Sequence, residues 1–240
     1  MKKSKPKLVS RASQVNLRLL AAQTLVVTAF LGLALFLPAG SLAWPAAWIF
    51  LCLQLGFTAG LSLWLIRHDP ELLHERMIGI GREDQKGWDK VLLASVGVAY
   101  FGWLVLMGFD AGRYQWSRLP LLLQLLGAAG LLVSYYIFYL TFRENPYLSP
   151  AVRIQSERAQ RVVSTGPYRY VRHPMYAGFL VYTISTALLL GSGYGLIGGL
   201  VLIALVAWRA VREERVLRAE LPGYAEYMSE VRYRLVPYVW

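Results

Sequence analysis

Long apolar runs alternate with short polar segments along the 240 residues, and the lengths of the runs suit helices that cross a membrane. A spanning helix needs about 20 mostly apolar residues. Four runs of about this length follow one another in the N-terminal half, at residues 19–37, 44–66, 91–109 and 121–142. The pattern therefore predicts four transmembrane spans in this part of the chain.

The last apolar run is too long for a single span. Residues 175–208 are almost uncharged, and a helix of this length would extend about 50 Å at 1.5 Å per residue. Gly191-Ser192-Gly193 interrupts the run with residues typical of turns. We therefore predict a helical hairpin here, and in total an all-α, polytopic membrane helix bundle of about six hydrophobic helices. Residues 1–142 would form the N-terminal spans, and residues 143–240 a second region with the hairpin and a C-terminal tail.

The composition agrees with a membrane protein. Hydrophobic residues make up 56% of the chain and charged residues 16%, and the mean hydropathy is +0.42. The first apolar run has no small-x-small cleavage end, so we expect it to remain as a span. Cys52 is the only cysteine, which excludes an intrachain disulfide and a cysteine-based zinc site.

The basic residues lie where membrane topology would place them. If the N-terminus is cytoplasmic, the segments 1–18, 67–90, 143–173 and 208–240 face the cytoplasm, and they hold 23 of the 25 Lys and Arg residues. This positive-inside pattern explains the net charge of +11 without nucleic-acid binding. We expect an integral membrane protein with both termini in the cytoplasm, in contact with membrane lipids. Nothing requires a eukaryotic organelle, so a prokaryotic inner membrane is the expected location.

Titratable residues are scarce within the early spans. None of these four runs contains Asp or Glu, whereas a proton or ion path usually leaves an intramembrane carboxylate. Transport is therefore disfavoured, and any chemistry is expected at the cytoplasmic face. His68 and His74 flank Asp69 and Glu71, but a metal site needs three or four converging ligands. We interpret that segment as a solvated loop and expect no metal.

The most informative candidate segment is 162–178. Gly166-Pro167 signals a turn, and Arg172-His173-Pro174 places two cation-capable side chains directly before a hydrophobic helix. The N–H groups at such a helix start suit a carboxylate or phosphate, and the tyrosines of the segment offer faces that hold a sulfonium or ammonium. The same composition is also typical of a belt at the membrane interface.

A second candidate follows the last apolar run. Glu213 and Glu214 point about 100° apart on a helix, so one can face inward while the other faces a basic neighbour. Arg209 precedes Glu213 by one turn, at the spacing of a same-face pair. Taken alone, the pattern is equally typical of a solvated, salt-bridged helix end. The Tyr- and Arg-rich tail at 221–238 would either cap a site or form another interfacial belt.

Together these segments resemble the isoprenylcysteine carboxyl methyltransferase family, whose pattern phospholipid N-methyltransferases share. The resemblance rests on Arg-His-Pro-x-Tyr-x-Gly at 172–178, the hairpin and Glu213-Glu214, and it covers about residues 143–240. It implies an all-helical membrane methyltransferase that uses S-adenosylmethionine. By similarity, the cofactor would contact Gln155, Gln160, Arg161, Val162, Val163, Tyr168, Arg172, His173, Pro174, Met175, Tyr176, Gly178 and Glu214.

The resemblance assigns catalysis to Arg209, Glu213 and Glu214. If Glu213 is the functional glutamate, Arg209 lies one turn earlier and would orient the substrate; if it is Glu214, the matching position is Ala210 and that role is vacant. The implied reaction is methyl transfer to a lipid-like or prenylated acceptor that arrives from the bilayer. An arginine would suffice for a carboxylate acceptor, whereas an amine needs a base, so O- and N-methylation both stay open.

An NADPH-dependent membrane sterol or steroid reductase is the alternative. Such proteins share an Arg-His-Pro-x-Tyr type of motif, and their C-termini resemble residues 231–238. Asn usually follows the His-Pro pair in them, whereas Met175 stands here and favours the methyltransferase. A non-enzymatic membrane scaffold with the same fold would bind neither cofactor.

Overall fold

The structure, a computed structural model, describes residues 15–78, 81 and 83–240, and its regular elements within these ranges are all helical. The five basic residues before Arg18, which support the expected orientation, lie outside the described residues. In chain order the elements are α1 (Leu17–Ala39), α2 (Pro45–His68), α3 (Pro70–Ile78), α4 (Gly87–Met107), the π-helical η2 (Gly108–Tyr114), α5 (Leu121–Glu144), the 3₁₀ turns η3 (Ser156–Arg158) and η4 (Gly166–Arg169), α6 (Pro174–Leu190), α7 (Gly193–Glu220) and α8 (Tyr224–Glu230).

All six predicted hydrophobic helices are present, and the protein is a polytopic helical membrane bundle. Helices α1, α2, α4 with η2, α5 and α7 are long and apolar enough to cross a membrane, while α6 is shorter at 17 residues. The predicted hairpin joins α6 to α7. Gly191 adopts a left-handed φ of 79°, and the Ser192 hydroxyl accepts a hydrogen bond from the N–H of Gly195. The turn therefore combines a glycine C-cap with a serine N-cap.

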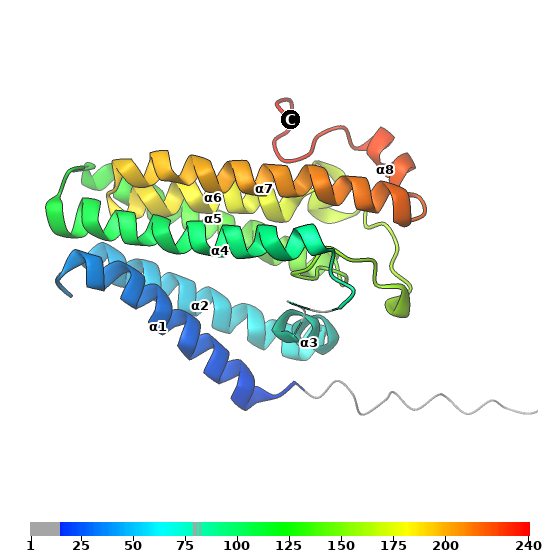
Figure 1. Ribbon diagram of the computed structural model, residues 1–240, viewed down its shortest axis with the longest axis horizontal. Coiled ribbons are helices and arrows are strands. Elements are labelled where there is room, and N and C mark those ends of the chain that lie inside the picture. The colour runs from blue at the N-terminus through cyan, green and yellow to red at the C-terminus, as the bar shows by residue number, and fades with distance from the viewer. Residues whose placement is uncertain (1–14, 79–80, 82) are drawn as a thin grey trace, which may run out of the picture.

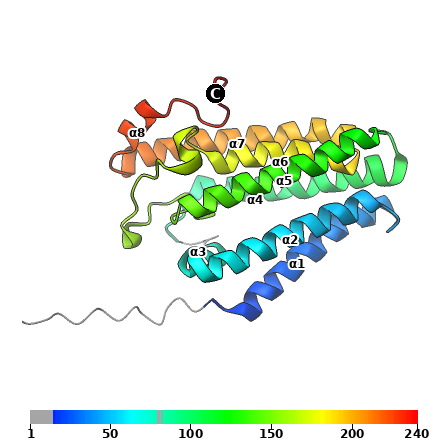
Figure 2. The same cartoon turned by 180° about the vertical axis from the view of Figure 1, so that it is seen from behind.

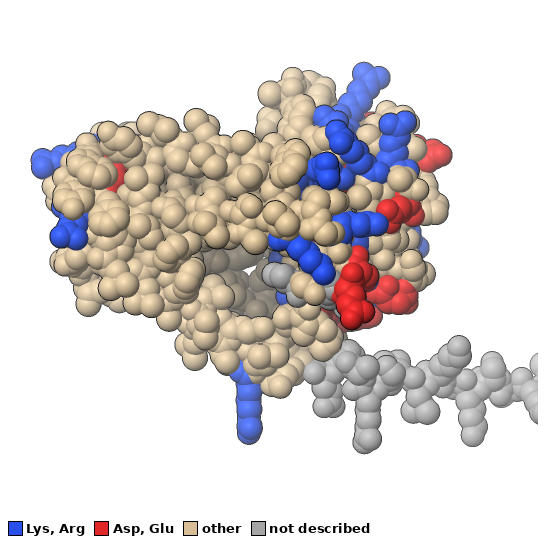
Figure 3. All heavy atoms as spheres, viewed as in Figure 1, with Lys and Arg blue, Asp and Glu red and all other residues tan. Residues whose placement is uncertain are grey.

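Helices α4, α5, α6 and α7 form one group of long helices, and the α1–α2 hairpin packs beside it (Figures 1 and 2). Within the group, α6 packs against both α5 and α7, and α4 packs against α7. Helices α3 and α8 and the loop between α5 and α6 lie at the same end of the bundle. Charged side chains gather at this end, which we call the polar end (Figure 3).

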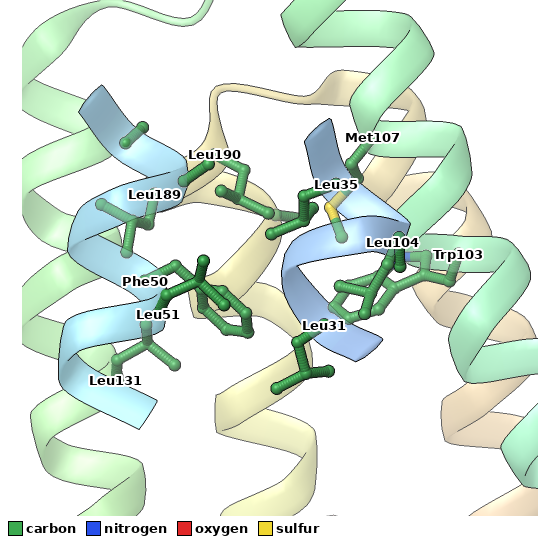
Figure 4. Close-up of a cluster of buried hydrophobic side chains, with 14 of the residues drawn as sticks. Leu31, Leu35, Phe50, Leu51, Trp103, Leu104, Met107, Leu131, Leu189 and Leu190 are labelled. Atoms are coloured by element: carbon green, nitrogen blue, oxygen red, sulfur yellow. The ribbon is translucent and has the colours of Figure 1, made fainter. Parts of the chain in front are cut away.

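A core of buried hydrophobic side chains joins the α1–α2 hairpin to the rest of the bundle (Figure 4). Leu35 of α1 and Phe50 of α2 are fully buried together with Leu104 and Met107 of α4. Trp103 adds a directional contact, because its indole N–H donates to the carbonyl of Gly195 in α7 at 2.6 Å. Close packing of this kind supplies much of the association energy between helices in a membrane.

Two local features correct the sequence interpretation. Residues 70–78 form helix α3 instead of a solvated loop: the Asp69 carboxylate accepts from the N–H of Leu72 at 2.9 Å, and Leu72 and Leu73 are buried. Helix α1 also continues through Pro38 to Ala39, so Pro38 lies in its last turn. The proposed division between residues 142 and 143 falls near the end of α5 and stays a prediction.

Gly127 tests the contact between α5 and α6. A Cβ atom there would lie 2.3 Å from the backbone nitrogen of Leu189 and 2.7 Å from the carbonyl oxygen of Ser185. Because these are backbone atoms of α6, Gly127→Ala should separate the two helices and destabilise the protein by about 1–3 kcal/mol. The melting temperature of the detergent-purified protein should fall. Gly102→Ala in α4 is the control, since its methyl group would meet no atom of the described residues within 4 Å. Equal melting temperatures would contradict the close contact.

Candidate functional site

The polar end of the bundle encloses a cavity of about 280 Å³. Its walls come from α3, the loop between α5 and α6, the start of α6, the C-terminal part of α7, and α8. The volume is close to the lower end of the range for small-molecule sites, about 300–1,000 Å³. Most site residues predicted from the sequence line it: Gln160, Arg161, Val162, Val163, Tyr168, Arg172, His173, Pro174, Met175, Tyr176, Arg209 and Glu213.

Three predicted residues are not part of the cavity lining. Gln155 is buried within the preceding loop, where its amide donates to the carbonyl of Tyr147 at 2.7 Å. Gly178 faces α5, since a Cβ there would lie 2.7 Å from the Phe138 ring. Glu214 points toward basic side chains behind the cavity wall. The structure therefore places these three in supporting positions.

The buried carboxylate of Glu214 joins the Arg-His-Pro motif to the C-terminal tail. It accepts from Arg172 Nε at 2.6 Å and from Arg234 Nε at 2.7 Å, and His173 Nε2 lies 3.3 Å away. Arg172 also donates to the carbonyls of Val231 and Arg232, both at 2.7 Å. The guanidinium of Arg172 is thus held by internal partners, and these contacts fix the motif in place.

Glu213 faces the cavity instead. Its carboxylate accepts from the Tyr176 hydroxyl at 2.5 Å, and the same hydroxyl accepts from Arg209 Nη1 at 2.7 Å. The ring of Tyr176 stacks on that of His173 with 5.4 Å between centroids. Arg209, Tyr176 and Glu213 therefore form one hydrogen-bonded chain along the cavity wall.

Arg209 is anchored by Asp89, a residue that the sequence analysis missed. The Asp89 carboxylate is fully buried and accepts from Arg209 Nε at 2.8 Å, from Gln85 Nε2 at 2.8 Å and from the N–H of Val152 at 2.8 Å. Arg209 Nη2 donates to the carbonyl of Pro150 at 2.7 Å. Full pairing of this kind is what a buried carboxylate requires. The available signal was an acidic residue in the first turn of a long apolar helix.

Arg76 of α3 is a second missed cavity residue. It donates to the carbonyl of Leu148 at 3.1 Å, and its guanidinium lies 4.8 Å from the centroid of the Phe142 ring. Burial and the nearby Arg209 lower the pKa of Arg76 to about 10, so it remains a cation at neutral pH. No carboxylate within the described ranges pairs with it. The sequence analysis could not identify Arg76, because it did not predict helix α3.

The tail closes the cavity, which was one of its two expected roles. Tyr224 and Tyr227 of α8 are buried against Tyr168 and Leu221. The Tyr227 hydroxyl donates to the carbonyl of Tyr168 at 2.7 Å, and Asn145 donates to the Tyr168 hydroxyl at 2.8 Å. Burial raises the pKa of Tyr168, so its phenol stays neutral. These contacts hold the loop before α6, in which Tyr168 lies, against α8.

A second, apolar cleft of about 360 Å³ lies between α2, α4, α5 and α6. Leu93 of α4 lines both spaces, so the cleft adjoins the cavity. The surface is hollowed between α4 and the α1–α2 hairpin (Figure 3). Polar atoms in the cleft pair with each other, Tyr100 with Tyr182 at 2.6 Å and Tyr135 with Gln54 at 3.0 Å. The cleft is therefore suited to an apolar chain.

Residues 149–219 match the family model of the isoprenylcysteine carboxyl methyltransferase (ICMT) family. This segment, less than a third of the chain, is similar to that family. The ICMT segment includes most of the loop before α6, the whole hairpin, and Arg209, Glu213 and Glu214. The chain is also similar to a Delta(14)-sterol reductase of Mus musculus, 32% identical over 121 residues. That match covers 45% of this chain and 29% of the reductase, so it spans less than a third of that relative.

The two glutamates of the ICMT segment should respond differently to substitution. Glu214→Gln removes the charge that balances buried Arg172, and should reduce stability by about 3 kcal/mol or more. Glu213→Gln keeps an acceptor for Tyr176 at a half-buried position, so the loss should be much smaller. Melting temperatures of the two variants in detergent measure this difference. Equal losses would contradict the separate roles that the contacts indicate.

Proposed function

We propose that the protein transfers a methyl group from S-adenosylmethionine to a lipid-like acceptor at the cytoplasmic membrane face. One observation carries this proposal: residues that the ICMT resemblance assigns to the site, 160–163 and 172–176 together with Arg209 and Glu213, line a single cavity that adjoins an apolar cleft. A polar cofactor and an apolar acceptor need such neighbouring spaces. The polar end would then face the cytoplasm, in agreement with the positive-inside pattern.

The cavity lining has the donor and acceptor types that S-adenosylmethionine requires. Glu213 offers a carboxylate for an ammonium group, and Gln160 offers an amide. Tyr168 and Tyr176 offer aromatic faces for a sulfonium. When bound, the cofactor supplies a methyl group on sulfur that is open to in-line displacement. The task of the protein is then to hold two reactants in line and to exclude water, and α8 with the tail covers the cavity for this purpose.

The cations of the cavity favour a carboxylate acceptor over an amine. Arg76 and Arg209 both line the cavity and lie close enough for Arg209 to lower the pKa of Arg76. Asp89 balances the charge of Arg209, whereas no described carboxylate pairs with Arg76, so the net charge of this pair of arginines attracts a carboxylate and repels an ammonium group. Asp89 and Tyr176 fix the orientation of Arg209, so a carboxylate oxygen could be held toward the cofactor without a general base. We therefore favour O-methylation.

The reductase alternative has one observation in its favour, the similarity to a Delta(14)-sterol reductase. The cations of the cavity would also suit the phosphates of NADPH. The match to the ICMT family model and the Met175 position favour the methyltransferase. Binding of the two cofactors separates the alternatives directly.

Calorimetric titration of the detergent-purified protein should show saturable binding of S-adenosylhomocysteine and none of NADPH. Glu213→Gln should weaken the first interaction about tenfold, because a charge-assisted hydrogen bond is replaced by a neutral one. The sample must melt cooperatively before titration, which demonstrates folding. NADPH binding alone would move the site to reductase chemistry, and binding of neither would favour a scaffold.

Gly97 tests the apolar cleft as the acceptor site. It lines the cleft, and no atom of the part of the chain that the structure describes lies within 4 Å of a Cβ at this position, so Gly97→Leu should fold and fill the space. Methylation of farnesylated cysteine should fall at least tenfold while S-adenosylhomocysteine affinity stays unchanged. The matched control is Gly102→Leu on the same helix, because Gly102 is outside the cleft lining and also has open space around it.

Equal turnover by the two leucine variants would contradict the acceptor assignment. A farnesyl amine offered in parallel tests the preference for a carboxylate. If the amine were methylated faster than the farnesylated cysteine, the argument from Arg76 and Arg209 would be wrong.

A further inference from the structure

Tyr224 lines the cavity, although it lies outside the segment that matches the ICMT family model. It is the first residue of α8, and its side chain is only 4% exposed. Its ring packs beside that of Tyr227, with 5.7 Å between centroids. The position of Tyr224 is therefore fixed by the tail that closes the cavity.

The hydroxyl of Tyr224 has no hydrogen-bond partner among the residues that the structure describes. Its neighbour Tyr227 provides the contrast, because that hydroxyl is paired with the Tyr168 carbonyl. A buried hydroxyl without a partner is destabilising, and natural proteins rarely retain one without a use. The unpaired donor of Tyr224 is thus the unusual feature of this wall.

The surroundings of Tyr224 keep its phenol neutral. Burial, followed by the nearby carboxylates of Glu213 and Glu214, raises the pKa of Tyr224. A neutral phenol both donates and accepts a hydrogen bond. Tyr224 can therefore pair with a hydroxyl, an amine or a carboxylate of a ligand, once a small shift of the cavity wall uncovers its hydroxyl, which is buried in the free protein.

We propose that Tyr224 is a further binding residue of the cavity, whose hydroxyl forms a hydrogen bond with a polar group of the adenosyl cofactor. The inference rests on the proposed function, since the ligand is taken to be S-adenosylmethionine or its product. The tail would then contribute a residue to cofactor recognition and also cover the cavity. The free protein keeps an unsatisfied donor, and binding of the cofactor satisfies it.

Tyr224→Phe separates binding from stability. Removing an unpaired buried hydroxyl should leave the melting temperature of the ligand-free protein equal or higher, yet weaken S-adenosylhomocysteine binding about tenfold in calorimetric titration. The matched variant is Tyr227→Phe, which loses the hydrogen bond to the Tyr168 carbonyl and should melt at a lower temperature. The gain in melting temperature on adding S-adenosylhomocysteine should shrink in Tyr224→Phe.

Titration with 5′-methylthioadenosine identifies the group that Tyr224 contacts. Equal weakening for this ligand and for S-adenosylhomocysteine assigns the contact to the nucleoside, and weakening for S-adenosylhomocysteine alone assigns it to the amino-acid end. Wild-type affinity of Tyr224→Phe for both ligands would overturn the inference. So would a weakened affinity that comes with a lowered melting temperature, because it would indicate a structural role. Failure of the wild-type protein to bind S-adenosylhomocysteine would instead defeat the proposed function itself.

Discussion

The buried carboxylate of Glu214 is the interaction on which the arrangement of the polar end depends. A carboxylate away from water is strongly destabilising unless charged donors surround it. Arg172 and His173 reach it from the start of α6, and Arg234 reaches it from the tail. Because these partners belong to two separate stretches of the chain and Glu214 to a third, satisfying one carboxylate brings α6, α7 and the tail together. Glu213, one residue earlier, is thereby directed into the cavity.

The buried ion pair of Asp89 and Arg209 has a similar effect, because it connects two of the long helices to the loop before α6. Asp89 at the start of α4 holds Arg209 of α7, and its other oxygen accepts from the N–H of Val152 in the loop before α6. The loop has little regular structure of its own, so such contacts determine where it lies. Arg209 consequently has a fixed orientation, which a substrate-orienting arginine needs. The two carboxylates, Asp89 and Glu214, therefore both support residues that line one cavity.

The sequence predicted those features of the structure that depend on residues close together in the chain. Apolar run length predicted the spans, and Gly191-Ser192-Gly193 predicted the hairpin. The position of Arg-His-Pro before a helix predicted where α6 begins. By contrast, the partners of buried charges come from distant segments, so nothing near Arg209 in the chain indicated Asp89. Helix α3 was missed for a related reason: it is nine residues long, and its stability comes from burying Leu72 and Leu73 against neighbouring helices.

The distinction between Glu213 and Glu214 shows how the structure refines such an interpretation. Helical geometry alone places the two side chains about 100° apart and does not say which one is enclosed by cations. The contacts give Glu214 the charged partners and give Glu213 the cavity. Since Arg209 lies one turn before Glu213, the arginine and the cavity-facing glutamate share a face of α7, with Tyr176 between them. An acceptor group held by Arg209 would then lie beside the wall that we assign to the cofactor. This closeness is what transfer between two bound molecules requires.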